Sequence, residues 1–199
     1  MLYFSFPVSI GWLWQLNERY ALVLALLLPL LLRPARGPRG VAPLLLVAAA
    51  ALFAAGNAVV QFRAFEAEVG PFEQVLEQAA PGRHLLGMML DQNSTVAKFS
   101  PFIHFASYYR ARKGGVASFS FAELPQSPLR YRPGMGPPPK PPGWEWHTLE
   151  YSNSREGPYY DYVLVRATTD PFPVIPNDDG PHWKLIVHQG RWSLYQRLP

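Results

Sequence analysis

The longest uninterrupted apolar stretch of the chain runs from Val41 to Phe62. It holds 22 residues without a charge, and its strongly polar side chains, Asn57 and Gln61, lie near its end. At about 1.5 Å per residue, a helix of this length reaches about 33 Å, which is enough to cross the roughly 30 Å hydrocarbon core of a bilayer. A buried helix of a soluble domain would carry a polar stripe, which is missing here before Asn57. The pattern therefore predicts a membrane span over 41–62.

A second apolar run, Ala21 to Leu32, precedes this stretch. Twelve residues are short for a span, but a helix extended back to Leu13 would cross, and Pro29 is tolerable in a membrane helix. Trp12, Trp14 and Tyr20 flank a polar segment, as aromatic residues do at the level of lipid headgroups. The start of the chain lacks the positive region of a cleaved signal peptide. We expect a first span over about 13–32, so that residues 1–62 form a membrane helical hairpin.

The loop between the two runs, residues 33–40, carries Arg33, Arg36 and Arg39 and no acidic residue. Arginines gathered in a short loop between apolar runs mark the cytoplasmic side of a membrane. The alternative is an ordinary solvated turn, which has no need of three like charges. The pattern predicts a multi-pass protein of the cytoplasmic (inner) membrane, with everything after Phe62 on the extracytoplasmic side.

Residues 63–199 alternate between helical and strand-like patterns. This succession predicts a small α/β domain, in which a layered sheet is covered by helices on at least one face. Residues 124–143 form a proline-rich loop without a core pattern. The predicted helical segments are Phe65–Ala80, which Pro71 divides into a linker turn and a second helix starting near Gly70, and Phe102–Lys113. The predicted strands are His84–Leu90, Val116–Phe121, Tyr160–Ala167 and a final hairpin of Trp183–His188 with Trp192–Arg197.

Composition narrows the classes of function. The net charge of +4 owes much to the arginines of one loop, and no basic-aromatic pattern suggests nucleic acid as a partner. The absence of cysteine excludes disulfides and thiolate metal sites. The sequence contains no glycine-rich phosphate loop, nucleophile elbow or zinc motif, so we expect no cofactor and no metal.

The most site-like segment is Asp91 to Thr95, a polar run directly after the first strand of the domain. Ligands of open α/β sheets bind beyond the carboxyl ends of strands, where this loop would lie. Asp91 and Asn93, together with His104 in the next helix, are the candidate ligand-binding residues, with Asp91 as base or ligand and His104 as proton shuttle. The alternative is a loop whose polar side chains form turns and caps. No catalytic residue is assigned.

An aromatic cluster in the second half of the domain has several interpretations. Trp144, Trp146 and His147 could stack on a sugar, rest on lipid headgroups or cover the sheet, and the sequence does not choose among them. His104 and Tyr108 share a helix face at the spacing of a metal-binding pair. A metal pair would need a second histidine, so packing is the better interpretation.

Residues 11–33, GWLWQLNERYALVLALLLPLLLR, resemble the late membrane segments of bacterial polytopic glycosyltransferases of the family 39 type, which include protein mannosyltransferases and lipid-A aminoarabinose transferases. The segments PGRHLLGMMLD, HFASYYRARKGG, YDYVLVR and GRWSLYQR are similar to the small extracytoplasmic domain that follows the last span in some of these enzymes.

This resemblance implies the C-terminal membrane and extracytoplasmic part of a glycosyltransferase-like protein that uses a polyprenyl-phosphate sugar donor. The catalytic acid of the family lies in an early extracytoplasmic loop that has no counterpart here, so the chain is not expected to catalyse transfer alone. The expected partners are the lipid bilayer and a polyprenyl-phosphate sugar. The alternative is a non-enzymatic, membrane-anchored extracytoplasmic interaction module whose protein partner the sequence does not identify.

Overall fold

The computed structural model describes residues 9–10, 13–14, 38–123, 127–141, 143–169, 172 and 179–199. The chain divides into two compact units, residues 1–57 and residues 58–199.

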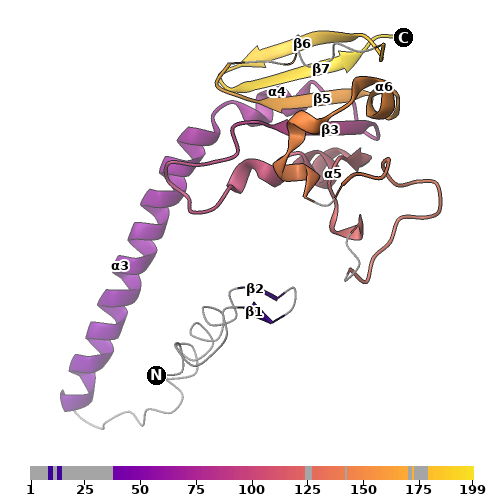
Figure 1. The fold of residues 1–199 in the computed structure, drawn as a ribbon. Coiled ribbons are helices and arrows are strands. Elements are labelled where there is room, and N and C mark those ends of the chain that lie inside the picture. Colours follow the sequence, from indigo (N-terminus) through magenta and orange to yellow (C-terminus); the bar gives the residue numbers. More distant parts are fainter. Residues whose placement is uncertain are drawn as a thin grey trace. The chain divides into compact units, whose positions relative to one another are not determined.

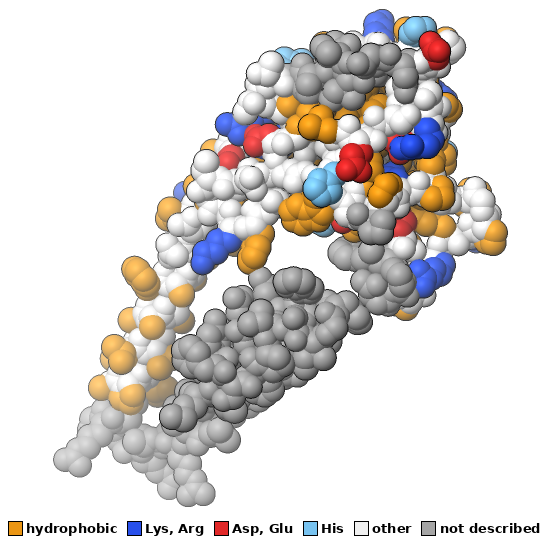
Figure 2. Space-filling model, viewed as in Figure 1, with side chains coloured by type: hydrophobic (Ala, Val, Ile, Leu, Met, Phe, Trp, Pro, Cys, Tyr) orange, Lys and Arg blue, Asp and Glu red, His pale blue; other side chains and the backbone are white. Residues whose placement is uncertain are grey.

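One long helix, α3 (Pro38–Val69), contains the whole of the predicted span 41–62. Its segment Val41–Val69 is long and apolar enough to cross a membrane, and the most apolar part of that segment is not buried against the rest of the described chain. Figure 2 shows hydrophobic side chains on the outer surface of this helix, while Lys, Arg, Asp and Glu gather mainly on the domain. The helix is longer than predicted at both ends. It begins inside the predicted loop 33–40, where Pro38 suits a first helical turn because its nitrogen needs no hydrogen-bond partner.

The first predicted span, 13–32, lies largely outside the described residues. Its first two residues, Leu13 and Trp14, form a short strand, β2 (Leu13–Trp14), which pairs antiparallel with β1 (Ser9–Ile10). A helix that begins at Leu13 is therefore not what the structure has. In the described part of residues 1–62 there is one membrane-length helix and no helical hairpin.

Residues 58–199 build the predicted α/β domain around a five-stranded sheet of order β4-β3-β5-β7-β6. Strands β3, β4 and β5 are parallel, and β7 pairs antiparallel with both β5 and β6 (Figure 1). The final hairpin turns at Gly190, whose positive φ of 59° favours glycine. The strands are β3 (His84–Met89), β4 (Val116–Ala117), β5 (Tyr162–Arg166), β6 (Trp183–Gln189) and β7 (Trp192–Arg197).

Two predicted elements are shorter or less regular than expected. The predicted strand Val116–Phe121 stops at Ala117, and one step further the amide of Gly87 donates to the Ser118 side-chain oxygen at 2.9 Å. The Ser118 hydroxyl thus accepts the hydrogen bond from Gly87 of β3 that a backbone carbonyl of a longer β4 would have accepted. The predicted helix Phe102–Lys113 is divided into a 3₁₀ turn, η1 (Pro101–His104), and helix α5 (Ser107–Lys113), and 3₁₀ turns are frequent at helix starts.

Strands β3 and β5, which are almost continuous apolar runs, are covered on both faces, whereas the edge strand β6 has no buried residue. Leu85 and Met89 of β3 face helices α4 (Phe72–Glu77) and α5. Leu86 and Met88 face the opposite layer, which includes Trp144, Tyr151 and Tyr160. That second layer is built from short turns and helix α6, namely η3 (Trp144–Trp146), η4 (Thr148–Glu150), α6 (Asn153–Glu156) and η5 (Gly157–Tyr159).

The two parallel crossovers use opposite faces and run in opposite directions. From β3 the chain passes through α5 to β4, and from β4 it returns through the second layer to β5 on the other side of β3. The carboxyl ends of β3 and β5 therefore lie side by side, at a point where the connections that leave these strands diverge. Open α/β sheets bind ligands at such a position.

The end of α3 belongs to the domain. The Phe65 ring lies 5.4 Å from the Phe102 ring, and the Trp192 indole N–H donates to the Val69 carbonyl at 2.7 Å. Gly70, with a φ of 64°, ends the helix, and Pro71 follows it. The last turns of α3 are thus fixed to the sheet by packing and by a hydrogen bond.

Candidate functional site

The polar loop after β3 lies at the carboxyl edge of the parallel strands, as predicted. The amides of Leu90 and Asp91 both donate to the Arg166 carbonyl, at 3.0 and 3.1 Å. The two residues that follow β3 are therefore held to the last residue of β5 by backbone hydrogen bonds. This contact determines where the side chain of Asp91 points.

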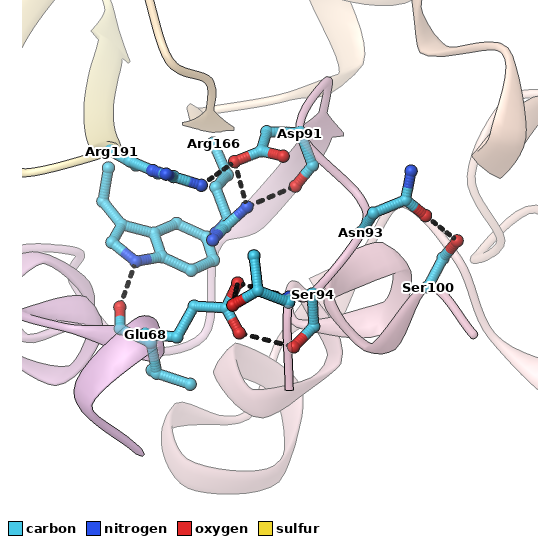
Figure 3. Close-up of polar contacts among 10 residues, drawn as sticks. Glu68, Asp91, Asn93, Ser94, Ser100, Arg166 and Arg191 are labelled. Atoms are coloured by element: carbon cyan, nitrogen blue, oxygen red, sulfur yellow. Dashed lines mark hydrogen bonds and ion pairs between the residues drawn. The ribbon is translucent and has the colours of Figure 1, made fainter. Parts of the chain in front are cut away.

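Asp91 is the counter-ion of two arginines. Its Oδ2 atom accepts from Nη1 of Arg166 and from Nη1 of Arg191, each at 2.6 Å (Figure 3). Arg166 is fully buried, whereas the Asp91 side chain is 21% exposed and the Arg191 side chain is 48% exposed. Among the described residues, the hydrogen bonds to the Asp91 carboxylate all reach Oδ2. The other oxygen, Oδ1, is the one left for a ligand.

The Arg166 guanidinium lies between aromatic rings. Its central carbon is 3.4 Å from the centroid of Phe102 and 5.6 Å from that of Trp192. Its Nε and Nη2 atoms are buried and have no hydrogen-bond partner among the described residues. Burial lowers the pKa of Arg166, and the charge and hydrogen bond of Asp91 oppose that shift. Asp91 and the ring faces together make this buried charge tolerable.

The other two predicted residues have different surroundings. Asn93 Oδ1 accepts from the Ser100 hydroxyl at 2.9 Å, which closes the loop on itself (Figure 3). His104 stacks on Phe119 with ring centroids 4.5 Å apart. Burial lowers the pKa of His104, and the negative charge of Glu145 partly opposes this shift. The structure places Asp91 and Asn93 on one loop but directs each toward a different partner, and their role in ligand binding stays a prediction.

Glu68, near the end of α3, holds the same loop from the other side. Its carboxylate accepts from the Ser94 hydroxyl and, at 2.9 Å, from the Thr95 amide (Figure 3). Ser94 also accepts from the amides of Val96 and Ala97, at 3.0 and 2.9 Å. Together with the contacts of Phe65 and Val69, this clamp forms what we call the α3 joint, defined by Phe65, Glu68, Val69, Ser94, Thr95, Phe102 and Trp192.

Two neighbouring clefts open at the carboxyl edge and share Leu90 and Leu149. We call them together the edge cleft. The first has a volume of about 420 Å³ and is lined by Leu90, Asp91, Leu149, Ala167, Thr168 and Thr169. The second has a volume of about 280 Å³ and is lined by Leu90, Gln92, Trp146, His147, Thr148, Leu149 and Glu150.

The aromatic cluster divides between the core and this cleft. Trp144 is buried in the layer that covers the sheet, whereas Trp146 is half-exposed and lines the edge cleft. The Gln92 side-chain amide donates to the carbonyls of Glu145 and Trp146, both at 3.2 Å. Gln92 thereby fixes the segment that carries Trp146 against the loop after β3.

The edge cleft is lined by hydroxyl, carboxylate and aromatic groups. It offers hydroxyl groups from Thr168 and Thr169, the free oxygen of Asp91 and the flat face of Trp146. Among the described residues, no group of three His, Cys, Asp or Glu side chains is placed to hold a metal ion. A further cleft of about 420 Å³ lies at the opposite ends of the strands, where it is lined by Arg83, Asp161 and Arg197.

Comparisons of the chain with protein-family models, with curated protein sequences and with solved structures give no match. The resemblance to family 39 glycosyltransferases stays a prediction.

Sequence reasoning missed Arg166, Arg191 and Glu68 as parts of this site. One signal was present for Arg166, since it follows the apolar residues of YDYVLV and a charge in a buried strand needs a partner. Nothing local marked Glu68 or Arg191. Their partners lie 26 and 100 residues away along the chain.

Replacement of Asp91 by Asn should destabilise the domain by about 3–5 kcal/mol, because it leaves the buried Arg166 charge without its counter-ion. Urea unfolding of the purified full chain in detergent, followed by tryptophan fluorescence, measures this loss.

The matched control is Arg191→Gln, which removes the half-exposed partner of the same carboxylate. Because exposed ion pairs contribute about 0–1 kcal/mol, this variant should remain close to the wild type. If Asp91→Asn lowers the free energy of unfolding no more than Arg191→Gln does, Arg166 does not depend on Asp91.

The lowered pKa of His104 predicts a dependence of stability on pH. The folded state holds a proton on His104 less readily than the unfolded state, in which the pKa of histidine is near 6.5. The contribution of neutral His104 to the free energy of unfolding is therefore complete above pH 6.5, and it is lost as the pH falls below that value. His104→Gln should therefore reduce the loss of unfolding free energy between about pH 7.5 and pH 5.5. A His104→Gln variant with an unchanged slope would contradict the assignment.

Proposed function

We propose that the chain is an inner-membrane protein whose extracytoplasmic α/β domain binds the sugar portion of a polyprenyl-phosphate donor for a glycosyltransferase-like assembly. In this proposal the chain supplies binding and positioning, and it does not catalyse transfer alone. The observation that carries it is the edge cleft, a polar and aromatic site on a domain that continues directly from a membrane-length helix.

The membrane anchor rests on the exposed apolar surface of α3. Leu52 and Phe53 are 74% and 80% exposed, and residues of this kind are exposed around the whole middle of the helix. An exposed apolar surface of this size is unfavourable in water and favourable in lipid. The apolar run Ala21–Leu32 would belong to a first crossing that precedes it.

The orientation rests on the arginines of the loop before α3. Arg33 and Arg36 precede the helix, and Arg39 lies in its first turn. Because positive residues near a span favour the cytoplasm, the amino end of α3 is inside and its carboxyl end, with the domain, is outside.

Sugar binding is the chemistry that the edge cleft fits. Carbohydrate recognition combines an aromatic face for the sugar ring with donors and acceptors for its hydroxyl groups. Trp146 supplies such a face, while Asp91, Thr168 and Thr169 supply oxygen atoms. Arg191, which is half-exposed and bound to Asp91, is a cation available beside the cleft for the donor phosphate.

Asp91 and His104 already have other contacts, and for this reason we do not propose catalysis by the chain alone. A general base must be free to take a proton, but Asp91 neutralises two arginines through one oxygen. His104 is stacked on Phe119. A reacting pair would have to come from elsewhere in the assembly.

The second candidate is a non-enzymatic, membrane-anchored interaction module. The observation that favours it is the proline-rich loop, which exposes the apolar side chains of Leu129 and Met135. Lys140 ties this loop to the domain, because it donates to the Ser118 carbonyl and its ammonium lies 4.8 Å from the Trp144 ring centroid. In this candidate the loop would dock a partner protein, and the edge cleft would bind no sugar.

Reporter fusions after Pro199 test the orientation. An alkaline phosphatase fusion should be active, because that enzyme needs an oxidising compartment, and a green fluorescent protein fusion exported by the same route should be dark. The reversed pattern would place the domain in the cytoplasm and overturn the proposal.

Binding of a hexose-charged, short-chain polyprenyl phosphate to the full chain in detergent tests the sugar role. Trp146→Ala should weaken this binding about tenfold, which corresponds to about 1.4 kcal/mol, because the sugar ring loses its aromatic face. Isothermal titration calorimetry measures the affinity. Uncharged polyprenyl phosphate, titrated in parallel, separates the contribution of the sugar from that of the lipid.

The matched control is Leu129→Ala, an exposed apolar residue of the proline-rich loop, which should bind as the wild type does. Asp91 is unsuitable as a test position because its removal also destabilises the domain. A wild-type chain that binds the charged and uncharged lipids equally would reject the sugar role and favour the interaction module.

A further inference from the structure

Phe99 combines two unfavourable features. It is the described non-glycine residue with a positive φ, at 65°, a region that bulky side chains rarely adopt. Its side chain is also 74% exposed. Strained backbone persists where the surrounding structure enforces it, and such positions are often functional. A large aromatic side chain directed into solvent by a strained backbone therefore calls for a partner.

The segment that carries Phe99 is attached to α3 on both sides. Before it, Ser94 and Thr95 bind Glu68, and after it the Phe102 ring packs against Phe65. The six residues between Thr95 and Phe102 thus lie beside the last turns of α3. Phe99 is held close to the place where the helix leaves its apolar stretch.

The distance of the Phe99 segment from the end of the apolar stretch, measured along the axis of α3, can be estimated from the rise per residue of a helix. The uncharged stretch ends at Phe62, so Phe65 stands about 4.5 Å and Glu68 about 9 Å further along the axis. The headgroup region adds about 5–8 Å to each side of the hydrocarbon core. Both attachment points of the segment therefore fall within or just above the headgroup region, and any tilt of α3 brings them closer to the core.

The residues around this level suit a membrane interface. Lys98 and Arg63 are exposed, and Phe62 is exposed on the last apolar turn. Long basic side chains extend to lipid phosphates while neighbouring aromatic rings enter the boundary of the acyl chains. A basic residue beside an exposed aromatic residue is the chemistry of an interfacial contact.

We propose that Phe99 is a second contact of the domain with the bilayer, inserted into the interface of the leaflet from which α3 emerges. The inference rests on the membrane span of the proposed function. Because α3 alone would leave the domain free to rotate about one axis, a second contact sets which face of the domain meets the lipid. The α3 joint transmits this orientation to the loop that borders the edge cleft.

The absence of cysteine from the chain allows a direct test. Single-cysteine variants Phe53→Cys, Phe99→Cys and Leu149→Cys, in the full chain, are labelled with an environment-sensitive fluorophore and reconstituted into vesicles of phosphatidylethanolamine and phosphatidylglycerol. The labels at positions 53 and 99 should be quenched several-fold more by nitroxide lipids than the label at 149, an exposed apolar residue of the domain. Aqueous iodide should give the opposite order.

A second variant pair excludes insertion driven by the label itself. With the label on Lys98→Cys and Phe99 intact, quenching by nitroxide lipids should be strong, and it should fall several-fold when Phe99→Asp is added. Circular dichroism shows whether both variants are folded.

Lipid quenching at 53 but not at 99 would overturn the inference and leave the membrane span standing. Absence of lipid quenching at 53 would overturn the span, and the interfacial contact with it. Quenching at 98 that does not respond to Phe99→Asp would also overturn the role of Phe99.

Discussion

The buried guanidinium of Arg166 is the group on which the described site depends. A buried cation is costly unless it has a close counter-ion, and Asp91 meets that need from the loop after β3. The aromatic rings on which Arg166 stacks also have other partners: Phe102 packs on Phe65, and Trp192 binds the Val69 carbonyl. One charge and its surroundings thus join the end of the sheet, the polar loop and the end of the long helix.

The composition of helix α3 changes along its length. From Val41 to Phe62 it is apolar on all sides, as lipid requires, and it needs no polar stripe because its backbone hydrogen bonds are internal. From Arg63 to Val69 it becomes amphipathic: Phe65 and Val69 pack on the core while Glu66 is exposed. The apolar stretch of α3 and the last turns that pack on the domain therefore have different residue patterns.

The groups around the edge cleft are held in place by other contacts. Asp91, which follows β3, accepts hydrogen bonds from Arg166 and Arg191. A ligand in the edge cleft would meet groups already held in place by backbone and side-chain bonds, such as the Gln92 contacts that support Trp146. Groups fixed before binding lose little freedom on binding, which suits a recognition surface.

The pattern of apolar and polar residues close together in the sequence was sufficient to predict much of the fold. The apolar run 41–62 predicted a membrane-length helix, the apolar strand after Arg83 predicted β3, and Gly190 marked the final hairpin. These features depend on the period and polarity of neighbouring residues, which a single sequence contains. The same information misjudged the length of the strand at Val116, because the side chain of Ser118 takes over there from the backbone.

Only the tertiary structure decided what the polar loop does. Asp91 meets Arg166 across 75 residues and Arg191 across 100, and Glu68 meets Ser94 across 26. Such pairs depend on the order of the strands, β3 beside β5 and β5 beside β7, and no periodicity encodes that order. The sequence by itself determined which segments prefer lipid, strand or helix, since those preferences are local. The long-range pairing of Asp91 with Arg166 and Arg191 required the fold, and the role of Asp91 in ligand binding stays a prediction.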